Sequence, residues 1–188
     1  MTSLVQMFDA SVPPNSPYPG CRAVAGYIGG NTPHVWSAAE WNRASDNGRL
    51  AQLPIWVAFG ETDPVGHAKQ AASAAVRLGW APHHSPDWRA IVADVEAVQE
   101  TAWLEAFGTQ LRAEGFLCWP YMSASALSSD PPGYTVWLAR WDGVADVPPI
   151  HDVIAHQYTH DRPFRSTTVD LSVVLPGALE SFGVGPRR

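Results

Sequence analysis

The sequence predicts an α/β fold, a single closed barrel in which strands alternate with helices. Eight apolar runs of strand length recur along the chain, and longer segments of helical character separate many of them, which is typical of parallel strands joined by crossovers. The chain has 188 residues, 46% of them hydrophobic, enough for one substantial core and too few for two ordinary domains. Eight strands indicate a TIM-like (β/α) barrel. The runs occupy residues 4–8, 23–28, 53–59, 90–95, 116–121, 134–140, 153–157 and 168–173.

Three helices are expected between the early strands. The first opens with Ser37 and Glu40, a capping-box pair, and the second opens with Asp63 and Pro64 and ends at Gly79. These signals mark helix ends, so the crossovers in this half of the chain are helical. The expected helices span residues 37–47, 63–78 and 100–114.

The last third of the chain is expected to carry fewer helices. Proline-rich turn signals at residues 130–133 and 147–149 leave little room for crossovers, so the barrel is predicted to be irregular on that side. No internal repeat or linker divides the chain. We expect the barrel to occupy residues 1–175 and residues 176–188 to form a flexible or docking tail.

Composition excludes several classes of protein. Only 16% of residues are charged and the net charge is -6, so no basic face is expected for a nucleic acid. No stretch reaches the roughly 20 apolar residues of a membrane span, and the start resembles no signal peptide, so we expect a chain made in a cytosol without membrane contact. The two cysteines, Cys21 and Cys118, are too few for a disulfide framework, and no pairing is expected.

The sequence predicts neither a metal nor a cofactor. His151, His156 and His160 are close along the chain, but their spacing lacks the His-Glu-x-x-His pattern and the approach to them is rich in proline. No phosphate-binding glycine loop and no Gly-x-Ser-x-Gly elbow are present. We expect His156 to be a polar residue of the barrel rim.

Acidic residues recur where the predicted strands end. Asp9 follows the first run, Asp94 and Glu96 close the fourth, and Asp170 lies in the last. Barrels of this kind carry their chemistry at the C-terminal rim. Side chains at i and i+2 share a strand face, so Asp94 and Glu96 are expected to point together, about 7 Å apart, as an acid and base pair. Glu61, after the third run, is explained as the lead-in to a helix.

Four segments follow in order along the chain: Met7-Phe8-Asp9-Ala10-Ser11, Ile91-Val92-Ala93-Asp94-Val95-Glu96, His156-Gln157-Tyr158-Thr159 and Val169-Asp170-Leu171-Ser172. Together they resemble the family-25 glycoside hydrolases, which are lysozymes. The similar features are their first-strand aspartate, their Asp-x-Glu signature, their late Trp-Gln-Tyr segment and their closing Val-Asp-x-Asn strand. Two positions depart from the pattern, because His156 stands for the usual tryptophan and Ser172 for the asparagine.

A closer resemblance in the first half is to the family-25-like domain of unknown function seen in actinobacteria and their phages. It is carried by Gly26-Tyr27-Ile28-Gly29-Gly30 and the helix that follows. The family resemblance implies that Glu96 is the proton donor and Asp94 the second catalytic carboxylate. It further implies that Asp9 and Asp170 position the substrate and tune that pair.

Aromatic residues at the rim would suit a sugar. Tyr121 ends the fifth run and Trp141 follows the sixth, and flat aromatic faces stack on sugar rings. With Gln157, Tyr158 and His156 from the late segment, these residues are the expected substrate-binding set.

The sequence thus predicts an N-acetylmuramidase-like hydrolase that cleaves the peptidoglycan glycan of a bacterial cell wall. A different class stays open: a non-catalytic or wall-binding barrel, such as a tail or capsid subunit of a phage with other virion proteins as partners. This alternative is suggested by the absence of an export signal and of wall-binding repeats. Either protein would act at the wall, as part of a virion or after lysis-linked release. A third reading, a metal-dependent hydrolase, predicts bound zinc, which we do not expect.

Overall fold

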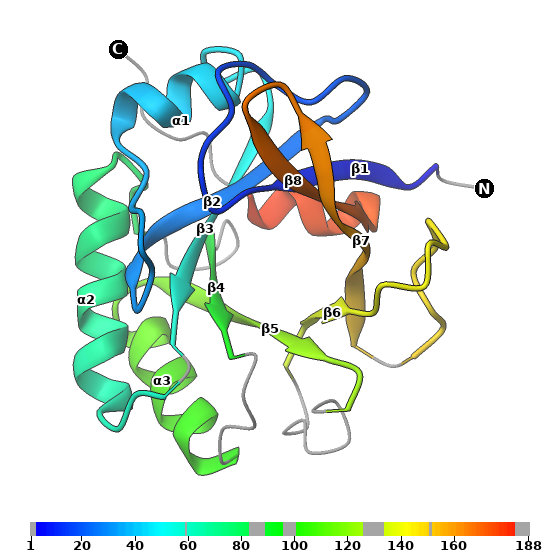
Figure 1. Cartoon of the computed structure of the whole chain (residues 1–188). Helices are drawn as coiled ribbons and strands as arrows, with labels where there is room; N and C mark the ends of the chain where they lie inside the picture. Colours follow the sequence, from blue (N-terminus) through cyan, green and yellow to red (C-terminus); the bar gives the residue numbers. More distant parts are fainter. Residues whose placement is uncertain are drawn as a thin grey trace.

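The strands of the computed structural model close into one barrel (Figure 1). The structure describes residues 3–58, 60–82, 89–95, 101–125, 134–150 and 152–182. The strands are neighbours in sequence order and the last pairs with the first, which confirms the predicted barrel. They are β1 (Val5–Asp9), β2 (Ala23–Gly30), β3 (Ala51–Val57), β4 (Arg89–Asp94), β5 (Phe116–Ser123), β6 (Val136–Ala139), β7 (Val153–Phe164) and β8 (Thr167–Val174).

The last strand runs against the others, so the expectation of an all-parallel barrel is wrong there. β1 to β7 pair in parallel, whereas β8 pairs antiparallel with both β7 and β1. The cause is the length of β7, which continues to Phe164 and leaves two residues before β8. A link that short makes a hairpin and no crossover. The first half of β8 therefore lies at the rim where the other strands end.

The helices cover one side of the barrel. α1 (Ala38–Ala44), α2 (Pro64–Arg77) and α3 (Thr101–Ala113) lie on the left in Figure 1, outside β2 to β5. The capping box is present, since Ser37 Oγ accepts from the Glu40 backbone and Glu40 accepts from the Ser37 backbone. In the described part of the chain no α-helix follows β5, β6 or β7, and no helix is long and apolar enough to cross a membrane.

The core has two layers. Inward-facing residues fill the barrel, and outward-facing residues pack under the helices. The outer layer holds Trp36, Trp41 and Trp80, whose rings contact one another at centroid distances of 4.8 and 4.9 Å. Gly26 lets Trp36 lie against β2, because a Cβ there would meet the indole ring at 2.6 Å. The barrel interior is formed by Met7, Ala23, Ala25, Leu53, Ile55, Ala90, Val92, Trp119, Tyr121, Trp137, Ala155 and Val174.

A short 3-10 helix, η2 (Pro176–Ser181), packs against the barrel at the start of β4, the end away from the rim. The Arg89 guanidinium donates to the backbone oxygens of Glu180 and Phe182, at 3.2 and 2.7 Å. Phe182 is buried and meets Trp119 edge to face at 5.5 Å. Residues 176–182 of the expected tail are thus docked on the barrel, and residues 183–188 lie outside the described residues.

Both cysteines are free and buried in the outer layer. Burial raises the pKa of the Cys21 thiol to about 12, and it also raises the pKa of Cys118. Neither thiol is therefore ionised near neutral pH, which fits inert packing.

Candidate functional site

Three aspartates line one pocket at the rim. Asp9 and Asp94 are the last residues of β1 and β4, and each is only 4% exposed. Asp170 lies in the first half of β8. Because β8 is antiparallel, a residue early in that strand reaches the same rim as residues that end the parallel strands. The pocket has a volume of about 30 Å³, and its walls are completed by Tyr27, Ile55, Tyr121, Trp137 and Gln157.

Asp9 and Asp170 stand directly opposite each other in the β1–β8 pairing. Carboxylates in such cross-strand positions repel unless donors hold them. One donor comes from a bulged part of β7, where Asp161 has a left-handed backbone with φ 51°. Its N–H donates to Asp170 Oδ1 at 2.7 Å. The bulge thus turns a backbone N–H toward the site acid.

The side-chain amide of Gln157 on β7 is hydrogen-bonded to four residues. Its Oε1 accepts from the Tyr121 hydroxyl at 2.7 Å and from the Trp141 indole at 2.6 Å. Its Nε2 donates to Asp9 Oδ2 and to Asp170 Oδ2, both at 3.3 Å. Gln157 is 1% exposed, so this hydrogen-bonded group is part of the buried floor of the site.

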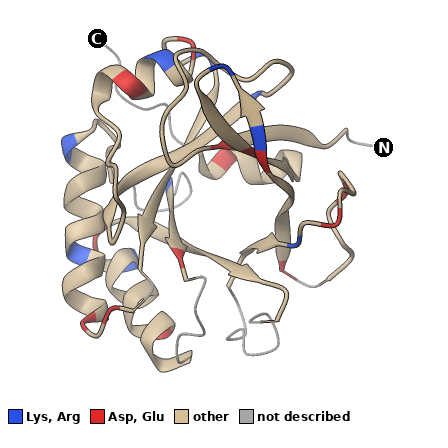
Figure 2. Ribbon diagram, viewed as in Figure 1, with Lys and Arg blue, Asp and Glu red and all other residues tan. Residues whose placement is uncertain are grey.

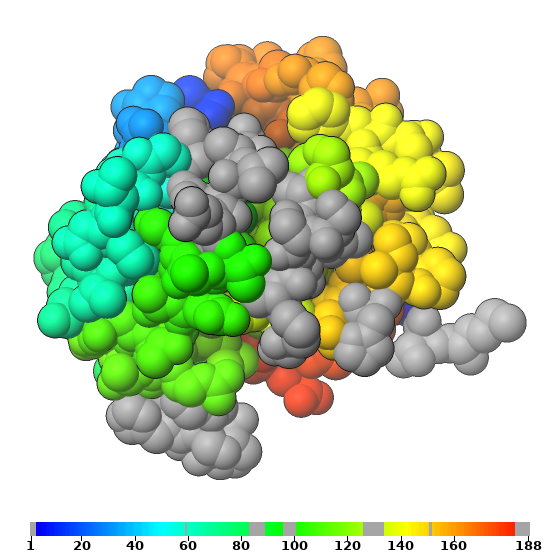
Figure 3. All heavy atoms as spheres, turned by 90° about the horizontal axis from the view of Figure 1, so that it is seen from below, coloured from blue at the N-terminus to red at the C-terminus, as the bar shows by residue number. Residues whose placement is uncertain are grey.

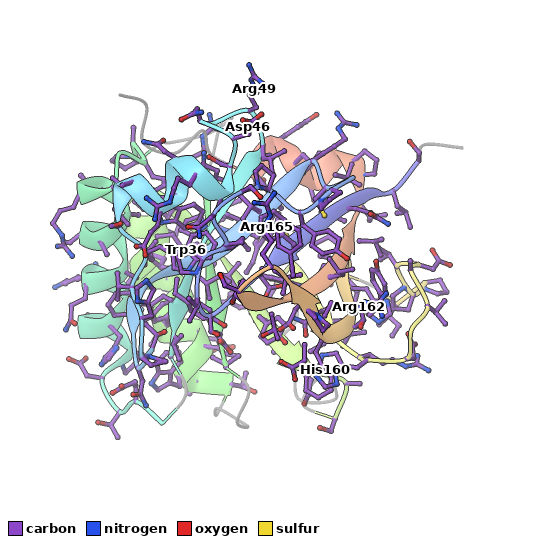
Figure 4. All side chains as sticks on the ribbon, turned by 45° about the horizontal axis from the view of Figure 1, so that its top comes forward. Trp36, Asp46, Arg49, His160, Arg162 and Arg165 are labelled. Carbon is purple, nitrogen blue, oxygen red and sulfur yellow. The ribbon has the colours of Figure 1, made fainter. Side chains whose placement is uncertain are left out.

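Aromatic side chains form the wall of the site toward β5 and β6. Tyr121 meets Trp137 edge to face at 5.0 Å, and the Trp137 indole donates to Ser172 Oγ at 3.1 Å. Ser172, which departs from the family pattern, therefore has a structural partner. Trp141 is 59% exposed and its ring lies 4.3 Å from that of His160. Figure 4 places His160 near the β7–β8 hairpin, far from the buried Trp36.

Two expected binding residues do not line the pocket. His156 is 2% exposed, and its ring nitrogens contact the backbone oxygens of Asp146 and Arg140 at 2.6 and 2.7 Å. Tyr158 lies against the outer layer, where burial raises the pKa of its phenol. Side chains alternate along a strand, so an inward Gln157 turns both neighbours outward. The structure therefore turns His156 away from the pocket, toward the backbone of residues 140–146.

Glu96 lies outside the described residues, so its spacing from Asp94 stays a prediction. Glu61 pairs with His67 at 3.1 Å, and His67 accepts from the Trp56 indole at 3.4 Å, which anchors α2 to β3 as a helix lead-in would. Among the described residues no group of three His, Cys, Asp or Glu could hold a metal ion.

Sequence reasoning missed three pocket residues, Tyr27, Ile55 and Trp137. Side chains two positions apart on a strand share a face. The inward-facing Ala25 and Leu53 therefore place Tyr27 and Ile55 on the inner face as well. Trp137 is the second residue of β6, and Trp141 follows two positions after the last residue of that strand, Ala139.

Two groups of segments lie on opposite sides of the molecule. Seen from below in Figure 3, the segments coloured as α2 and α3 lie on one side and those coloured as residues 134–165 on the other. In the view of Figure 2, Lys and Arg are scattered over helices, strands and loops and are not gathered on one face.

Neither a protein-family profile nor a curated protein matches the sequence. Solved structures do match the fold. An uncharacterized protein of B. stearothermophilus has a TM-score of 0.70 at 19% identity, covering 95% of this chain and 100% of that one. GHIP, a virulence factor and glycosyl hydrolase 25 of Streptococcus pneumoniae, has a TM-score of 0.63 at 16% identity, covering 94% and 89%.

The modular autolysin LytC of Streptococcus pneumoniae, solved with a synthetic peptidoglycan ligand, has a TM-score of 0.63 at 16% identity. The match covers 90% of this chain and 46% of LytC. The chain therefore has a barrel fold like that of family-25 glycosyl hydrolases, and identities this low establish the fold alone.

Proposed function

We propose that the protein is a glycoside hydrolase that cleaves the glycan of bacterial peptidoglycan. The observation that carries the proposal is the meeting of Asp9, Asp94 and Asp170, from three strands, in one rim pocket. The exposed Trp141 beside that pocket offers a flat face for a sugar ring. The fold shared with GHIP and LytC supports the same chemistry.

The proposed mechanism divides the work between carboxyl groups. Glycoside hydrolysis needs one protonated carboxyl group at the leaving oxygen and one carboxylate at the sugar carbon. Crowding of acids favours one group that keeps its proton. We assign the proton donor to Glu96 and the second catalytic role to Asp94. Asp9 and Asp170 position the substrate and supply the negative field.

The test is release of reducing sugar from purified actinobacterial peptidoglycan across about pH 4 to 7, where a carboxylic acid of raised pKa works best. The wild type is compared with Glu96→Gln, and Glu105→Gln on the exposed face of α3 is the matched control. Activity in the wild type and the control that is lost in Glu96→Gln supports the proposal. Activity that survives in Glu96→Gln removes Glu96 from the mechanism.

A wall-binding barrel without catalysis is the second candidate. It is favoured by the exposed Trp141–His160 pair, which offers a stacking surface that needs none of the acids. Such a protein would reach the wall as a virion subunit. Sedimentation with insoluble peptidoglycan, but no sugar release from it, would favour this candidate over the hydrolase.

A further inference from the structure

We infer that Gln157 is a positioning residue whose amide couples the exposed Trp141 to the buried Asp9 and Asp170. The sequence had placed it among the substrate ligands. The coupling rests on geometry alone, and only its effect on turnover rests on the proposed function.

The orientation of the amide is fixed by chemistry. An indole N–H is only a donor, so the Gln157 atom 2.6 Å from Trp141 Nε1 must be the oxygen. The Tyr121 hydroxyl, 2.7 Å from the same oxygen, supplies the second hydrogen bond. Both lone pairs of Oε1 are therefore used, and the amide cannot flip without losing the bond to Trp141, because an indole N–H cannot accept a hydrogen bond.

The NH2 group consequently faces the acids. Its two hydrogens meet two carboxylate oxygens, one on Asp9 and one on Asp170, each 3.3 Å from Nε2. These acids are cross-strand neighbours, and a donor shared between them offsets their repulsion and favours the ionised forms. All four hydrogen-bonding positions of the amide are thus taken by protein, so none is left for a substrate.

The coupling has a consequence for the ligand. Trp141 is 59% exposed, whereas Asp9 is 4% exposed, so one planar amide links a surface residue to a buried acid. A sugar ring stacked on Trp141 is thereby held at a fixed position relative to the carboxylates. This arrangement suits an oligosaccharide, with one ring on Trp141 and another ring at the acids.

The decisive experiment follows the Asp9 and Asp170 carboxyl groups by NMR titration, which needs no catalysis. Gln157→Met keeps the length of the side chain and removes its hydrogen bonds. We expect the titration midpoint of at least one of the two carboxyls to rise by about one pH unit. Gln52→Met is the matched control, because Gln52 on β3 is fully buried, faces away from the pocket and has no hydrogen-bond partner among the described residues.

Trp141→Phe is the second variant and keeps the test open if Gln157→Met fails to fold. It retains an exposed ring and removes only the indole N–H, which bonds Gln157 and not the acids. A smaller rise at Asp9 or Asp170 is expected from coupling through the amide. Unchanged midpoints in Trp141→Phe, or in folded Gln157→Met, would overturn the inference.

Turnover separates this inference from the proposed function. On peptidoglycan fragments, Gln157→Met should lower kcat by about 100-fold, because small displacements of reacting groups cost that much. KM should change little, and Gln52→Met should match the wild type in both constants. Shifted midpoints in a protein that cleaves nothing would refute the hydrolase and leave the coupling standing.

Discussion

Replacing His156 by alanine tests whether this buried ring holds the segment that carries Trp141. The ring nitrogens lie 2.6 and 2.7 Å from the backbone oxygens of Asp146 and Arg140, and Asp142 lies 3.8 Å away. A carbonyl left without its donor costs about 1–3 kcal/mol, and water can replace part of the loss in this exposed segment. We therefore expect His156→Ala to lower the free energy of unfolding by about 2–3 kcal/mol.

The assay is urea unfolding followed by circular dichroism, supported by thermal melting. For a domain of this size, the loss corresponds to a fall in Tm of about 4–12 °C. His160→Ala is the control, because that ring is 47% exposed, and its effect should stay within about 0.5 kcal/mol. A His156→Ala protein as stable as the control would refute the view that the ring stabilises the segment between Arg140 and Asp146.

Three further predictions concern packing and the thiols. Gly26→Ala should destabilise the fold by about 1–3 kcal/mol, measured by urea unfolding, because the new Cβ would meet Trp36 at 2.6 Å; a neutral change would show that Trp36 can move. Arg89→Met should cost about 1–3 kcal/mol through its two lost bonds to η2, and equal protease resistance of wild type and variant would contradict that docking. Cys21 and Cys118 should not react with a thiol reagent at pH 8 until the protein is unfolded, because burial raises both pKa values; rapid labelling of the native protein would contradict their burial.

The eight strands could be predicted because most are buried on both faces. A strand covered inside and outside, such as β4, is a nearly continuous apolar run that stands out from its surroundings. The second half of β7 could not be found in this way. Its residues from Thr159 to Phe164 are half-buried or exposed, so hydrophobicity ends at Gln157 although the hydrogen-bonded ladder continues.

The site was predictable only in part. Asp9 and Asp94 end apolar strands, and position alone indicated the rim. Asp170 was expected at the rim although the last strand was taken as parallel. A residue in the middle of a parallel strand would not reach the rim, and Asp170 does so because β8 is antiparallel. His156 and Tyr158 do not line the pocket with Gln157, because consecutive side chains of an extended strand point to opposite faces.

Closure by β8 also determines when the site can form. Asp9 and Asp170 are paired across the β1–β8 seam, yet nearly the whole chain separates them in sequence. Contacts of such long range form late, because loop closure must precede them. A growing polypeptide that has not yet released its final strand from the ribosome lacks Asp170 and the seam that faces it. The acidic pocket therefore forms only after β8 has emerged, and a chain truncated before β8 should be devoid of it.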